Sequence, residues 1–188
     1  MSFLTLVIPE DPTYNGYILK PLVERMLAEL DKPKARVAVL TNPRAEGYHH
    51  AKSLLPSILD RNPHMDLFLF LPDADGKDRS GKFEALEGDA LRRGLRLFCC
   101  AAIQEVETWL LAGHVEKLSQ PWSDIRSNTA VKEEIFQPFL TRFGDPRRAG
   151  GGRDLLMRET LSHYPGLLAR CPELKELQDR IQAGLGAS

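Results

Sequence analysis

The chain has 188 residues, of which 43% are hydrophobic and 27% charged, a composition that is typical of a folded globular domain and excludes a disordered or fibrous chain. A formal net charge of −1 excludes a protein that coats nucleic acid through a large basic excess, so phosphate contacts must be local. No apolar run approaches the roughly 20 residues that span a bilayer, and the N-terminus lacks the pattern of a secretion signal; we therefore expect a cytoplasmic protein that does not enter the membrane.

The first hundred residues alternate between apolar runs and segments with helical spacing. Strands are predicted at 3–8 (FLTLVI), 35–41, 66–71 (DLFLFL) and 95–102 (LRLFCCAA). Helices are predicted from Tyr17 to about Leu30, over 48–61 and, more weakly, over 83–93. Because Pro21 removes a backbone hydrogen bond from the first helix, we expect a kink there or a later start. Since the strands lack polar alternation, they are expected to be buried on both faces.

The rest of the chain predicts helices only. They are expected over 103–118, near 130–143, over 153–169 and over 172–183. Strands alternating with helices at about 30-residue spacing predict an α/β fold with a parallel four-stranded sheet, helices on both faces and right-handed crossovers. We assign residues 1–118 to this core and residues 119–188 to a helical C-terminal extension packed on it, the two forming one compact domain. The three cysteines form no Cys-x-x-Cys pair and are expected to be buried thiols.

Acidic residues follow three of the predicted strands. They are Glu10 and Asp11 after the first, Asp73 and Asp75 after the third, and Glu105 and Glu107 after the fourth. Ligands of an open parallel sheet bind outside the carboxyl ends of its strands, so these side chains should share one edge. Carboxylates crowded together repel each other unless a cation neutralises them, and oxygen ligands without His or Cys suit Mg²⁺ or Mn²⁺. The sequence therefore predicts a metal site at which such ions could activate a phosphodiester.

Each acidic motif also has an interpretation without metal. The stretch PDADGKD consists of residues that favour turns, and QEVETW could be the solvated first turn of a helix, where glutamate suits the helix dipole. An Asp-x-Asp-Gly after an apolar strand is also typical of phosphatases of the haloacid-dehalogenase type, in which the first Asp, here Asp73, would be the nucleophile. Lys77 stands after Gly76, where that type of phosphatase usually has threonine.

Positive charge is concentrated between residues 142 and 158. Five arginines lie there, Arg142, Arg147, Arg148, Arg153 and Arg158, against Asp145 and Asp154. Three glycines, 150–152, precede a predicted helix, so backbone N–H groups and arginine side chains could hold a phosphate at its start. The candidate contacts are Arg148 and Arg153, and a flexible solvated loop is the alternative.

Three motifs together resemble a known family. They are PEDPTYNGYILKPL near the start, QEVETWLLA in the middle and AGGGRDLLM in the extension. A Glu after the first strand and an Asp-x-Asp after the third resemble the Toprim domain of topoisomerases, primases and nucleases of the overcoming-lysogenization-defect type. The chain is most similar to the small stand-alone Toprim-like proteins of the DUF4276 family, over at least residues 3–170.

The resemblance implies a Toprim-like, Rossmann-like fold and a role for each acidic residue. Glu10 would be a general base or a metal ligand, Asp73 and Asp75 would be metal ligands, and Glu105 and Glu107 would complete the acidic set. It also implies Lys132 as a phosphate or transition-state contact, where a surface lysine on a helix is the alternative.

From these features we expect a phosphodiesterase or nuclease, dependent on Mg²⁺ or Mn²⁺, that acts on DNA or RNA. The resemblance implies a setting in phage or genome defence. One alternative is a small-molecule phosphohydrolase with haloacid-dehalogenase-like chemistry. The other is a non-catalytic regulatory module that partners an ATPase.

Overall fold

A parallel four-stranded sheet forms the centre of the protein, whose computed structural model describes residues 2–186. In chain order the strands are β1 (Leu4–Pro9), β2 (Arg36–Val39), β3 (Leu67–Leu71) and β4 (Leu97–Cys99). Their order across the sheet is β2-β1-β3-β4, and every pairing is parallel. The predicted α/β class and parallel sheet are confirmed, although β4 is shorter than the predicted 95–102.

Both faces of the sheet are buried, which explains the missing polar alternation in the strands. Successive side chains point to opposite faces. Leu67, Leu69 and Leu71 of β3 therefore join the larger hydrophobic cluster, while Phe68 and Phe70 join a second cluster on the other face. The alternation sorts the residues of one strand between two helix layers.

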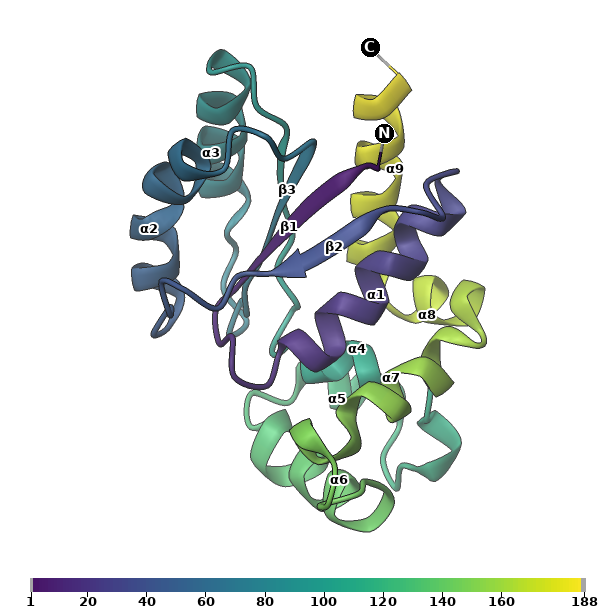
Figure 1. Cartoon of the computed structure of the whole chain (residues 1–188). Coiled ribbons are helices and arrows are strands. Elements are labelled where there is room, and N and C mark those ends of the chain that lie inside the picture. Colours follow the sequence, from purple (N-terminus) through teal and green to yellow (C-terminus); the bar gives the residue numbers. More distant parts are fainter. Residues whose placement is uncertain (1, 187–188) are drawn as a thin grey trace.

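Helices cover each face of the sheet. The first three are α1 (Gly16–Glu29), α2 (Tyr48–Arg61) and α3 (Ser80–Arg92). Figure 1 shows α2 and α3 on one face of the sheet, and α1 on the other face together with the last helix, α9 (Pro172–Gly186). Of the two alternatives expected at Pro21, the later start does not occur, because α1 begins at Gly16 and carries Pro21 in its second turn, where the proline ring is buried.

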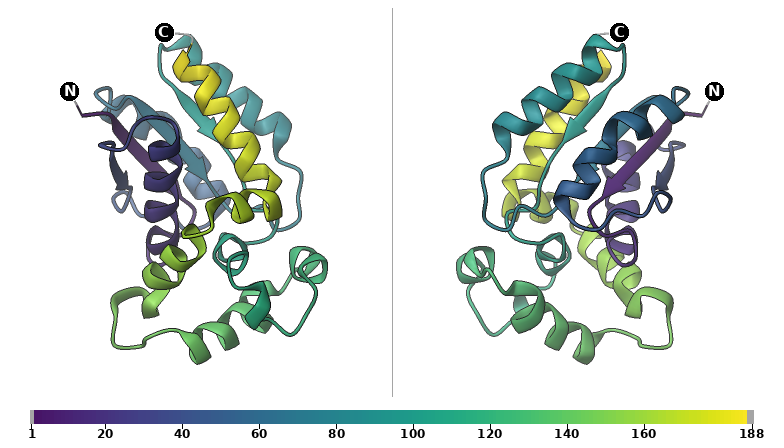
Figure 2. Two further views of the ribbon diagram at one scale, coloured as in Figure 1. Left: turned by 90° about the vertical axis from the view of Figure 1, so that its right-hand side faces the viewer. Right: turned by 90° about the vertical axis from the view of Figure 1, so that its left-hand side faces the viewer.

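Eight short helical elements join β4 to α9 in the described chain. They are α4 (Glu107–Leu111), the 3₁₀ turn η1 (Val115–Lys117), α5 (Trp122–Ser127), the π-helical turn η2 (Lys132–Phe136), α6 (Gln137–Phe143), the 3₁₀ turn η3 (Ala149–Gly152) and α7 (Arg153–Leu161), followed by α8 (Tyr164–Arg170). The side views show these helices at the end of the molecule opposite the two chain termini (Figure 2). They therefore lie beyond the carboxyl ends of the strands, where a ligand site is expected.

The predicted long helix over 103–118 is wrong, since α4 covers only five residues. The residues before α4 are held at the edge of the sheet, because the carboxylate of Asp73 accepts the N–H of Val106. At the other end, the hydroxyl of Thr160 donates to the carbonyl of Leu110, and Gly113 packs so tightly that a Cβ would lie 2.3 Å from that hydroxyl oxygen. Tertiary contacts at both ends thus override a strong helical pattern.

The predicted helix over 153–169 is divided into α7 and α8. Pro165 stands at the start of α8, where it needs no backbone N–H, but in a continuous helix its ring would clash with the carbonyl of Leu161. The helix predicted near 130–143 is present as η2 followed directly by α6. Its first part, η2, has the wider turn of a π-helix.

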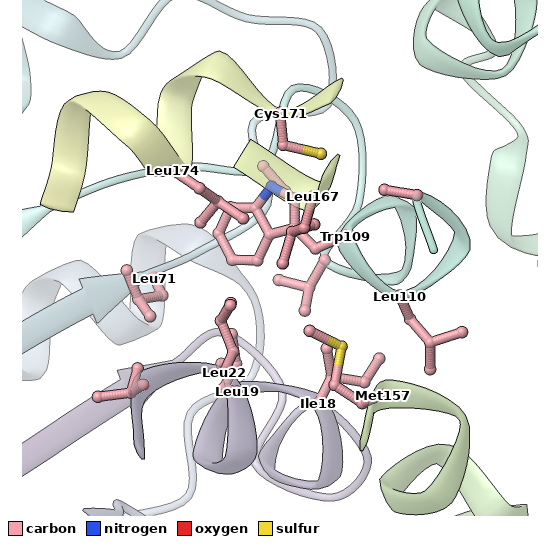
Figure 3. Close-up of a cluster of buried hydrophobic side chains, with 14 of the residues drawn as sticks. Ile18, Leu19, Leu22, Leu71, Trp109, Leu110, Met157, Leu167, Cys171 and Leu174 are labelled. Carbon is pink, nitrogen blue, oxygen red and sulfur yellow. The ribbon is translucent and has the colours of Figure 1, made fainter. Parts of the chain in front are cut away.

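The helix α9 returns to the sheet and closes the larger core. Trp109 of α4 is completely buried, and its indole lies beside Leu167 and Leu174, opposite Leu19 and Leu22 of α1 (Figure 3). The indole N–H donates to the Glu173 carboxylate over 2.9 Å. This packing fixes α4, and with it Glu107, against the sheet.

The outer edge of β4 is covered by side chains instead of another strand. The N–H of Cys99 donates to the Glu87 carboxylate over 2.6 Å, and Arg180 donates to the Cys99 carbonyl over 2.6 Å. Arg180 also pairs with Glu87, so one ion pair between α3 and α9 satisfies both backbone groups of the edge residue. Among the helices described, none is both long and apolar enough to cross a bilayer.

Candidate functional site

The acidic turn after β3 is held in place by backbone hydrogen bonds on both sides. Asp73 forms an isolated parallel bridge with Ala102, so the pairing of β3 and β4 continues past the regular strands. One Asp73 oxygen accepts the N–H of Val106 over 2.7 Å, and the Asp73 N–H donates to Glu10 over 3.1 Å. The ends of β1 and β3 and the segment after β4 therefore meet at Asp73, as the parallel sheet predicts.

Three carboxylates converge beside this turn. Oxygen atoms of Asp73, Glu105 and Glu107 all lie within 4.8 Å of one another. Asp73 and Glu107 are 6% and 1% exposed, and neither oxygen of Glu107 has a hydrogen-bond partner among the described residues. A buried carboxylate without hydrogen bonds is costly, so this arrangement favours a cation.

Burial and crowding shift the pKa values of Asp73 and Glu105. Burial, followed by the charges of Glu105, Glu107 and Glu10, raises the pKa of Asp73 to about 9. Burial also raises the pKa of Glu105, and the neighbouring ammonium of Lys132 lowers it in part. Without a cation, the folded protein therefore favours a protonated Asp73 at neutral pH.

Lys132 points into the same cluster from the π-helical turn η2. Its ammonium lies 3.4 Å from Glu105 and 3.5 Å from Glu107. Burial acts to lower its pKa, but Glu107 and Glu105 together raise it, so the ammonium stays charged. One lysine stands against three carboxylates, which leaves the cluster with an excess of negative charge. The sequence indicated this residue only through the family resemblance.

Two of the predicted ligands stand beside the cluster. The Glu10 carboxylate accepts the backbone N–H of Asp73 but lies outside the set of three converging carboxylates. Burial raises the pKa of Glu10. Asp75 has a side chain 49% exposed and faces Arg79 at 3.5 Å. The structure brings together Asp73, Glu105 and Glu107, with Glu10 next to them and Asp75 at the rim.

The two arginines predicted to contact phosphate near the glycine-rich segment, Arg148 and Arg153, bind other groups of the protein instead. Arg153 is 5% exposed, donates to the Gly150 carbonyl over 2.7 Å, and lies over the rings of Tyr14 and Phe136. Burial lowers its pKa, which the nearby charge of Glu107 partly offsets. Arg148 forms an ion pair with Asp154 over 3.0 Å. Arg153 thus lies close enough to the acidic cluster to feel the charge of Glu107, and its guanidinium is bound by the protein itself.

Two further buried polar residues escaped the sequence analysis. Arg79 is 7% exposed, stacks at 3.5 Å on the Tyr48 ring, and donates to the Ala74 carbonyl. Gln104 is 5% exposed, and its side-chain oxygen has no partner among residues 2–186. Arg79 supports the turn that carries Asp73. Gln104 opens the QEVETWLLA motif and Arg79 follows the acidic turn, so their positions beside the acidic residues could have indicated them.

The donor set suits a hard divalent cation. The three converging residues offer carboxylate oxygens, with no His or Cys among them, and this chemistry fits Mg²⁺ or Mn²⁺. Neither Glu107 oxygen accepts a hydrogen bond among the described residues, and one lies 3.5 Å from the Lys132 ammonium, so both would offer ligand positions once that ammonium moves. Glu105 is half-buried, so the cluster remains open to solvent and to a substrate on that side.

Comparison of the chain with protein-family models, with curated proteins and with solved structures gave no match. The Toprim-like resemblance therefore stays a prediction that rests on the sequence motifs.

Proposed function

We propose that this protein is a phosphodiesterase or nuclease, dependent on Mg²⁺ or Mn²⁺, that acts on DNA or RNA. The observation that supports it is the convergence of Asp73, Glu105 and Glu107 at the carboxyl edge of a parallel sheet, with one lysine to offset three carboxylates. When bound there, a divalent cation would polarise the phosphodiester and lower the pKa of a coordinated water.

The neighbouring side chains have properties that such a reaction needs. Glu10 is half-buried with a raised pKa, which suits a group that accepts a proton from attacking water at neutral pH. The Lys132 ammonium lies where it could hold a phosphate oxygen after a cation has taken the carboxylates. Arg153 is buried against Tyr14 and Phe136 and is close enough to feel the charge of Glu107, so we assign it a positioning role.

The choice of nucleic acid over a small phosphate ester rests on sequence and geometry together. Phosphatases of the haloacid-dehalogenase type need a free aspartate nucleophile. Asp73 is 6% exposed, its pKa is raised to about 9, and one of its oxygens accepts the N–H of Val106. These features favour a metal ligand over a nucleophile. A role in genome defence, with an ATPase or another defence protein as partner, rests on the Toprim-like motifs.

Incubation of the purified protein with plasmid, single-stranded DNA, RNA and p-nitrophenyl phosphate, each with Mg²⁺, Mn²⁺ or chelator, tests the proposal. We expect cleavage of at least one nucleic acid with metal, and loss of at least about a hundredfold in Asp73→Asn. The matched control is Asp89→Asn, an exposed aspartate on α3 that pairs with Arg92.

The same experiment separates the alternatives. Turnover of p-nitrophenyl phosphate without nucleic-acid cleavage would support a small-molecule phosphohydrolase. Absence of metal-dependent turnover on all four substrates would contradict an enzymatic function of the isolated chain and favour a regulatory module.

A further inference from the structure

A cavity of about 420 Å³ is lined by residues of the acidic turn that carries Asp73 and does not include the three converging carboxylates in its lining. Its walls are the turn itself, the start of α3, the end of β4 and the facing side of α9. Figure 2 shows α3 and α9 flanking β4 along its length. Ala74 lines the cavity and is the neighbour of Asp73 in sequence, so their Cα atoms are about 3.8 Å apart. The cavity therefore begins one residue from a proposed metal ligand.

The apolar part of the cavity lining, which we call the floor, consists of Ala74, Phe83, Cys99, Ala101 and Ile103. Burial raises the pKa of the Cys99 thiol above its usual range, so this side chain acts as an apolar surface. The volume falls within the range of about 300–1,000 Å³ that is usual for small-ligand sites. A flat ring could pack on this floor.

The rim offers hydrogen-bond acceptors. Glu84 on α3 and Glu176 on α9 both line the cavity, both are exposed, and neither has an ion-pair or hydrogen-bond partner within residues 2–186. The other carboxylates of the wall are engaged, since Glu87 pairs with Arg180 and Glu173 with Arg126. Two free carboxylates across an apolar floor suit a ring with amino groups.

A phosphate is a poor occupant of this cavity. The start of α3 faces it, but the carboxylate of Asp78 already accepts the N–H of Ser80 over 2.9 Å and so takes the anion position at the helix start. Arg180 is held by Glu87 and by the Cys99 carbonyl. Lys77 is the cation of the wall that has no such partner among the described residues, and it lies in the exposed turn.

We propose that this cavity binds a nucleobase that carries an exocyclic amino group. The ring packs on the apolar floor, and its amino group donates to Glu84 or Glu176, in the way that carboxylates accept from the amino group of cytosine. This inference rests on the proposed function. If nucleic acid is the substrate, the bound base belongs to a nucleotide next to the phosphate held near Asp73. A base enters such a cavity only when it is unpaired, so single strands are the preferred substrate.

Cytidine and uridine form the sharpest test, because they differ at the amino group while their ring sizes match. Binding is measured by ¹⁵N NMR titration of the metal-free protein, so the result does not depend on cleavage. We expect cytidine to bind about fivefold to tenfold more tightly than uridine. Shifts should be centred on Gly76, Ala101 and Ile103. Asp73→Asn should retain this preference.

Two variants locate the site. Ala101→Leu fills the floor and should abolish cytidine binding, and the double variant Glu84→Ala with Glu176→Ala should make cytidine and uridine equal. Glu116→Ala, an exposed glutamate on η1, is the matched control and should behave as the wild type. If Ala101→Leu does not fold, the double variant alone decides.

Equal affinities for the two nucleosides, no saturable binding, or cytidine binding that survives Ala101→Leu would each overturn the proposal. Failure of the proposed function is a separate result. Selective cytidine binding without metal-dependent cleavage would leave the base site standing and remove the nuclease, whereas cleavage without selective binding would do the reverse.

Discussion

At the scale of single residues, Asp73 links the charge of the site to the stability of the fold. Its folded pKa is raised to about 9, from 3.8 when unfolded, first by burial and then by Glu105, Glu107 and Glu10. Between these two values the folded state binds the proton more tightly than the unfolded state does. The stabilisation is therefore complete below about pH 4 and is lost as the pH rises toward 9.

Urea unfolding of the metal-free protein between pH 5 and 9 checks this. We expect the free energy of unfolding to fall with pH, with Asp73 contributing at most about 1.4 kcal/mol per pH unit. Asp73→Asn keeps an acceptor for the Val106 N–H without the charge, so its profile should be flatter. A wild-type profile no steeper than that of Asp73→Asn would contradict the raised pKa of Asp73 in the folded protein.

Lys132 should compete with a divalent cation for the same carboxylates. Its ammonium lies 3.4 Å from Glu105 and 3.5 Å from Glu107, so it must move when a cation arrives. Lys132→Met should lower the dissociation constant for Mn²⁺ roughly tenfold, because a nearby positive charge is removed. Turnover at saturating Mn²⁺ should fall, because the phosphate contact is lost.

The two effects can be measured separately, by electron paramagnetic resonance of free Mn²⁺ and by cleavage assays. Lys34→Met, an exposed lysine in the turn before β2, provides the control and should change neither. Mn²⁺ affinity that is unchanged or weaker in Lys132→Met would refute the competition.

At the scale of elements, the outer edge of β4 depends on one ion pair. Arg180 donates to the Cys99 carbonyl and to Glu87, which in turn accepts the Cys99 N–H. Arg180→Met should destabilise the protein by about 2 kcal/mol, because a half-buried carboxylate and a backbone carbonyl lose their partner. It should also promote self-association through the exposed strand edge.

Chemical denaturation and analytical ultracentrifugation measure the two consequences. The control is Arg92→Met, which removes an exposed pair with Asp89 and should stay within about 0.5 kcal/mol of the wild type. Equal stabilities of the two variants would show that the edge does not need its ion pair.

Sequence patterns predicted the elements of the sheet more accurately than those of the extension. The strands and the first three helices follow from local apolar spacing, and the parallel sheet follows from their alternation. The ends of α4 could not be predicted, because Val106 is held by Asp73 and Leu110 by Thr160, and both partners are distant in the sequence. The break at Pro165 had a local signal, since a proline rarely lies inside a helix.

The candidate site was predictable to a similar extent. The carboxyl-edge rule for parallel sheets selected Asp73, Glu105 and Glu107, which do converge. It could not place Asp75, whose backbone lies in the left-handed region and whose side chain faces Arg79. The orientation of a side chain in a turn depends on such local dihedrals. For the same reason, Arg153 could be named from the sequence, but its burial against Tyr14 and Phe136 could not.

At the scale of the whole molecule, one hydrophobic cluster joins the sheet to the extension. Trp109 packs beside Leu167 and Leu174 and opposite α1 (Figure 3). We therefore expect residues 1–118 and the extension to unfold together. Urea transitions followed by tryptophan fluorescence and by far-ultraviolet circular dichroism should coincide.

The variant Leu174→Ala tests the coupling. It should lower the stability by about 2–5 kcal/mol and shift both transitions equally. A circular-dichroism transition that stays in place while the fluorescence transition moves would divide the protein into two independent units.

The central claim is that Asp73, Glu105 and Glu107 together bind one divalent cation. The anomalous scattering of Mn²⁺ in a crystal of the protein grown with this ion tests it most directly. We predict a peak about 2.1 Å from an oxygen of each carboxylate, with the Lys132 ammonium displaced from the cluster. A fully ordered cluster without such a peak, and with Lys132 still between Glu105 and Glu107, would contradict the account.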